Sequence, residues 1–149
     1  MKNEGNIAGY AKQIVDYLPS ELKFSSELNK DWYKATDGKI YTKALADTII
    51  NPGETKEIKL VATKATTENN LGTTNNSAEI YESYNEYGVA DTDSTTGNNK
   101  TKEDDYGSAD ILITLNTGTI IMYISLTISV IAIIGIGAYM IKKKVLGEM

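Results

Sequence analysis

Carboxylates are the side chains of this sequence best suited to chemistry, and five of them flank one loop rich in Gly, Asn and Thr. They are Asp91, Asp93, Glu103, Asp104 and Asp105. Clustered carboxylates together with carbonyl oxygens suit Ca²⁺, which takes roughly six to eight oxygen ligands. The spacing differs from the Asp-x-Asp-x-Asp-Gly pattern of the EF-hand type of calcium loop. Two interpretations therefore stand: solvated acids of a turn, or a metal site whose candidate ligands are Asp91, Asp93, Asp104 and Asp105.

The composition removes most familiar catalytic chemistry. The 149 residues include 15 Lys, 20 acidic residues, no Arg, no His and no Cys, for a net charge of −5. A Ser-His-Asp triad, a cysteine nucleophile, the usual zinc site and a disulfide framework each need an imidazole or a thiolate. The acidic balance argues against nucleic acid as a partner, because binding there depends on a basic surface.

Glu79 and Glu82 are a nominal pair of glycosidase carboxylates, but nothing in the sequence marks a cleft around them. We therefore expect no enzymatic activity, no catalytic residues and no cofactor apart from the Ca²⁺ alternative. A second cluster consists of Tyr81, Tyr84 and Tyr87 with Asn85. It is consistent with a surface that binds a sugar or a protein. Because a three-residue spacing is wrong for one face of a strand, cross-strand packing and loop support are the other interpretation.

Short strands are the elements expected to position these residues. Apolar and polar residues alternate with period two in stretches bounded by turn residues. The stretches are Tyr10–Tyr17, Leu22–Phe24, Lys30–Ala35, Lys39–Thr42, Glu57–Thr63, Thr74–Tyr81 and Ala109–Leu115. Asp37-Gly38 and Asn51-Pro52-Gly53 are turn sequences. This pattern predicts an all-β, antiparallel β-sandwich. Thr42–Ile50 has a helical alternative, which its β-branched end disfavours.

Five motifs of this region occur in the order and rough spacing of a known module. They are Asn3-Glu4-Gly5, Asp16-Tyr17-Leu18-Pro19-Ser20-Glu21-Leu22-Lys23-Phe24, Asn51-Pro52-Gly53-Glu54, Asn75-Asn76-Ser77-Ala78-Glu79-Ile80 and Asp91-Thr92-Asp93-Ser94. Residues 1 to 115 thus resemble the conserved-repeat domain of bacterial cell-surface proteins, a domain of unknown function numbered eleven. The resemblance implies an immunoglobulin-like β-sandwich, often in tandem copies on a wall or envelope protein, with no catalytic residues to transfer.

The amino-terminal end departs from that family. An alternating apolar strand normally precedes the Asn-x-Gly turn, whereas here Met1 and Lys2 stand directly before Asn3. Residues 1 to 30 also lack a continuous apolar stretch of roughly 7 to 15 residues, which a signal peptide would need. We therefore expect a fragment, the C-terminal piece of a longer exported protein, with a sandwich truncated at its amino terminus and an unpaired sheet edge.

A charge-free stretch from Ile111 to Ile141 predicts a second kind of element. Within it Thr119–Ile141 gives 23 residues dominated by apolar types, which as a helix would span roughly 35 Å, enough to cross a bilayer. Tyr123 and Tyr139 lie near the two ends, where rings with one polar edge anchor at the membrane surface. The hydroxyls of Ser125, Thr127 and Ser129 are compatible with such a helix, because they can bond back to a carbonyl one turn earlier.

Lys142, Lys143 and Lys144 follow this predicted helix at once and set its orientation. Residues 1 to 118 hold 12 Lys against 19 acidic residues, or −7, whereas residues 142 to 149 hold three Lys against Glu148, or +2. Because cationic flanks are retained on the cytoplasmic side, we predict a single-pass protein of the cell membrane, with its bulk extracellular and its C-terminus cytoplasmic. A tail-anchored protein with its bulk in the cytosol is the alternative.

The predicted organisation is a surface domain at 1–115, a linker at 116–118, a transmembrane helix at 119–141 and a basic cytoplasmic tail at 142–149. Thr114-Leu115-Asn116-Thr117-Gly118, followed by the apolar span and the lysines, resembles the layout of a sortase signal without its Leu-Pro opening. Covalent wall attachment is therefore an alternative to permanent membrane anchoring.

Together these features indicate a non-catalytic cell-surface module that displays or spaces upstream domains, in a structural or adhesive role. Its expected partners are the membrane and the preceding repeats of a larger surface protein. The alternative is an extracellular module that binds Ca²⁺, a glycan or a protein.

Overall fold

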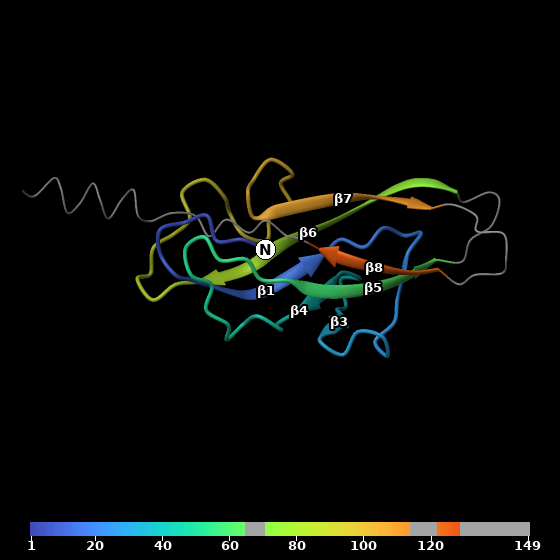
Figure 1. Cartoon of the computed structure of the whole chain (residues 1–149), viewed down its shortest axis with the longest axis horizontal. Helices are drawn as coiled ribbons and strands as arrows, with labels where there is room; N and C mark the ends of the chain where they lie inside the picture. Colours follow the sequence, from blue (N-terminus) through green and yellow to red (C-terminus); the bar gives the residue numbers. More distant parts are fainter. Residues whose placement is uncertain (65–70, 114–121, 129–149) are drawn as a thin grey trace, which may run out of the picture.

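The computed structural model describes residues 1–64, 71–113 and 122–128. Over these ranges the chain forms strands and no helix (Figure 1). The strands are β1 (Tyr10–Asp16), β2 (Lys23–Phe24), β3 (Trp32–Lys34), β4 (Ile40–Thr42), β5 (Ile58–Lys64), β6 (Gly72–Tyr84), β7 (Tyr106–Ile113) and β8 (Met122–Ile128).

The strands form two antiparallel sheets. Five strands pair in the order β3-β4-β1-β6-β7, and three pair in the order β2-β5-β8. The long pairing of β6 with β7 runs from Gly72↔Ile113 to Glu79↔Tyr106, and the register between β1 and β6 shifts around Gln13, which marks a bulge. Figure 1 shows β5 and β8 side by side and pointing in opposite directions.

The hydrophobic core draws on both sheets. Ile14, Ile40 and Ile80 of the five-stranded sheet cluster with Leu60 of β5, and each of these four side chains is at most 1% exposed. A smaller cluster joins Ala62 of β5 to Ile111 and Ile113 of β7 and to Leu22. Two antiparallel sheets with their apolar faces in a shared core are compatible with the predicted β-sandwich.

The alternation located the strands up to β7, although β1 and β4 bury successive residues and thus both faces. In β7, by contrast, Ile111 and Ile113 are buried while Leu112 between them is 68% exposed. The turns are also where they were predicted: Gly38 and Gly53 adopt φ values of 85° and 77°, which glycine tolerates best. The helical alternative for Thr42–Ile50 is wrong, because this stretch forms successive turns with bonds from Ala46 N to Lys43 O and from Thr48 N to Leu45 O.

The structure differs from the predicted transmembrane helix over seven of its residues. Met122–Ile128 is strand β8, paired antiparallel with β5 from Ile58↔Ile128 to Lys64↔Met122. Its sequence supports a strand because Ile124, Leu126 and Ile128 alternate with polar residues. The register sets these three opposite Ala62, Leu60 and Ile58, which contribute to the core. Alternation of this kind suits a half-buried strand, whereas the overall apolar content suits a helix in lipid.

Most of the predicted membrane anchor lies outside the described residues. Of the anchor residues, Tyr123 lies in β8 opposite Thr63. The linker at 116–118, Tyr139, the lysines Lys142, Lys143 and Lys144, and the motif that resembles a sortase signal all fall outside the described ranges. Within those ranges, no helix has the length and apolar character required to cross a membrane.

Candidate functional site

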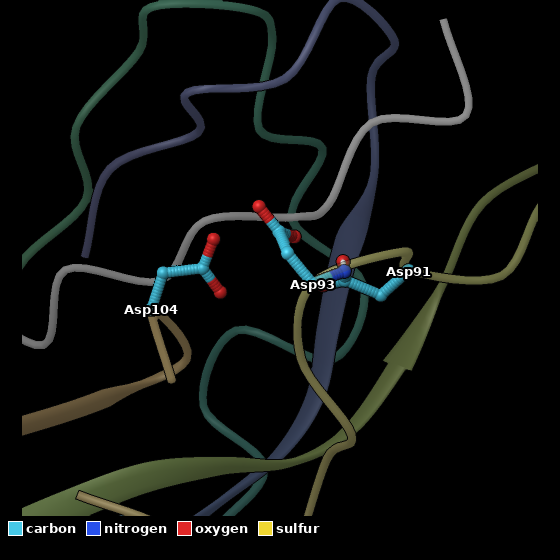
Figure 2. A group of neighbouring side chains, drawn as sticks. All are labelled: Asp91, Asp93 and Asp104. Atoms are coloured by element: carbon cyan, nitrogen blue, oxygen red, sulfur yellow. Dashed lines mark hydrogen bonds between the residues drawn. The ribbon is translucent and has the colours of Figure 1, made fainter. Parts of the chain in front are cut away.

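Three of the four candidate metal ligands come together at one end of the five-stranded sheet. Asp91 and Asp93 lie in the long loop between β6 and β7, and Asp104 lies just before β7 begins. One carboxylate oxygen from each lies within 4.8 Å of the others. Figure 2 shows the Asp93 and Asp104 carboxylates approaching each other, Asp93 from within the loop and Asp104 from the segment that leads into β7. Asp93 is exposed, whereas the other two are half-buried.

Short-range hydrogen bonds hold this loop in shape. Asp91 Oδ1 accepts a bond of 3.2 Å from the backbone N–H of Asp93, and its Oδ2 accepts one of 2.6 Å from the Ser94 hydroxyl. Glu103 Oε2 accepts bonds of 2.7 Å from the Thr95 backbone N–H and from Asn98 Nδ2. Glu103 therefore ties the two halves of the loop together and is not a member of the group of three.

Proximity of the carboxylates changes their proton affinities. Burial, followed by the charges of Asp93 and Asp91, raises the pKa of Asp104 to about 6. The pKa of Asp93 is also raised, first through its hydrogen bond with Asp91 and then by burial. Negative charges held this close repel one another, so either a proton or a cation would stabilise the group.

Asp105, the fourth candidate ligand, does not join the group. Its side chain is 1% exposed, and neither of its carboxylate oxygens has a hydrogen-bond partner among the described residues. Burial, followed by the charge of Glu79, raises its pKa to about 7. Asp104 and Asp105 lie in the turn just before β7, and only Asp104 belongs to the group of three.

A buried carboxylate that the sequence did not single out for this role holds the loop on the sheet. Glu79 of β6 is fully buried. Its Oε1 accepts bonds of 2.7 and 3.1 Å from the backbone N–H groups of Asn98 and Asn99, and Oε2 accepts one from the Tyr17 hydroxyl. Asn99 has a positive φ of 58°. Glu82, the other member of the nominal glycosidase pair, is exposed. It pairs with Gln13 of β1, whereas Glu79 pairs with Val15, and the register shifts between the two pairs.

The tyrosines do not form a single surface. Tyr81 meets Tyr41 edge-on at 5.2 Å between ring centroids, and the Tyr84 ring lies 5.9 Å from that of Tyr10. These contacts are cross-strand packing. Asn85 supports the following turn by accepting bonds from the N–H groups of Tyr87 and Val89.

Tyr87 is the most exposed of the three tyrosines, at 68%. It lines a half-open hollow of about 340 Å³ together with Tyr10, Ile7, Ile49 and Pro52. An aromatic ring beside apolar side chains is suited to contact with a ligand, so this hollow is the part of the predicted binding surface that the structure retains.

Comparisons with protein-family models, with curated proteins and with solved structures gave no match. The resemblance of residues 1 to 115 to the conserved-repeat domain therefore stays a prediction from the motifs of the sequence.

Proposed function

We propose that this chain is a non-catalytic, membrane-anchored module of a cell surface, whose immunoglobulin-like β-sandwich displays or spaces the preceding repeats of a larger protein. The observation that carries this proposal is the charge-free stretch from Ile111 to Ile141, followed at once by Lys142, Lys143 and Lys144. A stretch of that length and composition favours lipid, and the lysines favour the cytoplasmic side.

The all-β body is compatible with the displaying or spacing role that we propose. The buried side chains of both sheets supply its hydrophobic core, and the chain has no cysteine with which to form a disulfide. An anchored body of this kind transmits load or sets a distance without chemistry of its own. The helix at 119–141 and the strand β8 use the same seven residues, so the anchored state requires Met122–Ile128 to leave the edge of β5.

Cysteine labelling tests the proposed topology directly, because the natural chain has no thiol. Leu112, which is 68% exposed on β7, is replaced by Cys in one variant and Met149 in another. In intact cells that carry the full-length chain, a membrane-impermeant maleimide should label L112C, and it should label M149C only after the membrane is opened. Detergent, and not alkaline carbonate, should extract both variants.

Labelling of M149C in intact cells together with protection of L112C would reverse the orientation and favour the tail-anchored alternative. Release of the chain by carbonate would remove the anchor from the proposal altogether.

A second candidate function, weak binding of Ca²⁺, is favoured by the approach of the Asp91, Asp93 and Asp104 carboxylates to within 4.8 Å. Titration calorimetry of the full chain with CaCl₂ should show saturable heat that Asp104→Asn removes. Asp47→Asn is the matched control, because the Asp47 side chain is 99% exposed and outside the group. Absence of heat in the natural chain would reject this candidate.

A further inference from the structure

The hollow that Tyr87 lines is formed by three segments that lie far apart in the sequence. One wall comes from the residues that lead into β1, one from the loop before β5, and one from the turn after β6. Its volume of about 340 Å³ is at the lower end of the range for small-molecule sites. The hollow therefore has room for one ring of a ligand, and its open side lets the rest of a longer ligand project outward.

The first two walls are held together by one buried side chain. Asn3 is 0% exposed, and its Nδ2 donates bonds of 2.8 Å to Ile7 O and 2.7 Å to Ile50 O. Gly9 and Ile50 also exchange backbone bonds: Gly9 N–H donates one of 3.1 Å to Ile50 O, and Ile50 N–H donates one of 2.9 Å to Gly9 O. These bonds fix the segment before β1 against the loop before β5.

Asn85 holds the third wall in a similar way. Its Oδ1 accepts bonds of 3.2 and 3.1 Å from the N–H groups of Tyr87 and Val89, and its Nδ2 donates one of 2.7 Å to Val89 O. The Tyr87 residue is 68% exposed, but the backbone that carries it is tied into this turn. A ligand that enters the hollow meets walls that are already formed, which lowers the entropy cost of binding.

Two exposed polar side chains line the hollow and are available to a ligand. The Asn6 amide and the Glu86 carboxylate make no hydrogen bond and no ion pair among the described residues. They come from different walls, so they offer donor N–H groups and acceptor oxygens to a molecule placed between them. Hydroxyl groups, each of which both donates and accepts, pair well with this combination.

The charges around the hollow disfavour ionic ligands of either sign. Glu86 is the one charged side chain among the described residues that line it, and its carboxylate repels an anion. The face of a tyrosine ring attracts a cation, but the Lys12 ammonium group already lies 4.9 Å from the centroid of the Tyr10 ring. A second cation there would be repelled by Lys12. The hollow therefore suits a neutral ligand.

Aromatic surface continues from the hollow onto the neighbouring strands. Tyr10 lines the hollow, and its ring lies 5.9 Å from the ring of Tyr84, a residue that is 50% exposed. Tyr87 and Tyr10 thus offer ring surface in the hollow, and Tyr84 offers it beside the hollow. A ligand built from several rings, each with C–H groups on its faces and hydroxyls at its rim, matches this arrangement.

We propose that this hollow binds a neutral oligosaccharide. One sugar ring lies in the hollow with a face of C–H groups against the Tyr87 ring, and its hydroxyls bond to the Asn6 amide and the Glu86 carboxylate. The next sugar lies toward Tyr84. This binding role goes beyond the proposed function, because a module that displays or spaces other domains needs no ligand of its own.

Saturation-transfer NMR with the full-length chain tests the proposal. The chain is kept in a detergent without a sugar head group, so that the detergent does not compete, and the probes are maltotriose, cellotriose, mannotriose and tri-N-acetylchitotriose. At least one of these should receive saturation from the protein. Tyr87→Ala should weaken its binding about tenfold, whereas Tyr87→Phe, which keeps the ring, should bind within about twofold of the natural chain.

Tyr33→Ala is the matched control, because Tyr33 is also exposed, at 44%, and lies outside the hollow. It should bind as the natural chain does. The melting temperature of Tyr87→Ala should equal that of the natural chain, since the ring is largely in solvent, so a loss of binding there is not a loss of folding.

Absence of saturation transfer to every sugar, or equal transfer from the natural chain and from Tyr87→Ala, would overturn the proposal. Transfer to Nα-acetyl-lysine methylamide that depends on Tyr87, with none to the sugars, would also overturn it and would assign the hollow to a cationic peptide. None of these readouts depends on how the chain lies in a membrane, so they leave the proposed topology to its own test.

Discussion

Asp16 of β1 and Asn76 of β6 form a buried polar pair that is joined by one hydrogen bond. Two of its oxygen atoms have no hydrogen-bond partner among the described residues. Asn76 Nδ2 donates a bond of 2.7 Å to Asp16 Oδ2, and the two side chains are on residues 0% and 3% exposed. The remaining oxygen of each, Asp16 Oδ1 and Asn76 Oδ1, has no partner among the described residues. Both are acceptors, so a proton on the Asp16 carboxyl group supplies the donor that this pair lacks.

We predict that this pair makes the fold less stable as the pH rises. Burial raises the pKa of Asp16 from 3.8 to about 7. Between those pH values the folded chain keeps a proton that the unfolded chain has lost. The stabilisation is therefore complete below about pH 4 and is lost as the pH rises through 7. The loss has an upper bound of roughly 4 kcal/mol.

The measurement is the free energy of unfolding against pH for the natural chain and for Asp16→Asn. The amide of the variant is neutral at every pH and offers a donor, so its curve should be flatter and should cross above the natural curve near neutral pH. Asp47→Asn should follow the natural curve, because the Asp47 side chain is exposed. Parallel curves for the natural chain and Asp16→Asn would show that Asp16 does not titrate in this range.

Asn29 should contribute strongly to stability, because its side chain, in place of a neighbouring strand, supplies the hydrogen bonds of the Val61 backbone in β5. Its Oδ1 accepts a bond of 2.6 Å from Val61 N–H, and its Nδ2 donates one of 2.8 Å to Val61 O. Asn29→Ala leaves both backbone groups without partners and should cost about 2 to 3 kcal/mol in chemical denaturation. Asn75→Ala, which removes an exposed bond to Asp110, should cost less than about 1 kcal/mol. Similar losses would contradict this account of Asn29.

Glu79 should decide whether the loop between β6 and β7 stays closed on the sheet. Its two carboxylate oxygens accept from the Asn98 and Asn99 backbone and from Tyr17. Glu79→Gln replaces one accepting oxygen by an NH₂ group, which then faces the N–H and O–H donors that now bond to Glu79. The free energy of unfolding should therefore fall by about 1 to 3 kcal/mol. Hydrogen exchange at the Asn98 and Asn99 amides should speed up.

Glu82→Gln is the matched control for that variant, since Glu82 is exposed on the same strand. It should change the free energy of unfolding by less than about 0.5 kcal/mol and leave those amides protected. Unchanged exchange in Glu79→Gln would mean that the loop is held by other contacts.

The alternation of residue types predicted the strands up to β7 because period two depends only on neighbours in the sequence. Strand β8 was missed because its segment carries two signals. Ile124, Leu126 and Ile128 alternate with Ser125 and Thr127, yet they lie in a stretch apolar enough for a membrane helix. Which signal prevails depends on whether lipid or the β5 edge is available, and the sequence of the segment alone does not contain that information.

The sequence predicted the candidate site only for those residues whose proximity in space follows from their closeness in the sequence. Asp91 and Asp93 approach because the Asp93 N–H bonds to the Asp91 carboxylate two residues earlier, whereas the separation of Asp105 from Asp104 depends on how the chain turns before β7. Glu79 lies between the apolar residues Ala78 and Ile80, so period two alone places it on the other face of β6 from them. It is buried because residues 98 and 99, some twenty positions later, fold over it. No pattern among neighbouring residues in the sequence predicts this contact.

The central claim, that residues 119–141 anchor the chain, is tested most directly by a cysteine pair that reports where Met122–Ile128 lies. Val61 and Ser125 are opposite one another in the β5–β8 register, and the V61C/S125C double variant has no other thiol. When the full chain is inserted into lipid vesicles, mild oxidation should leave both thiols free, because the segment is in the bilayer. Formation of the disulfide in most of the vesicle-bound protein would keep β8 on the sheet and contradict the anchor.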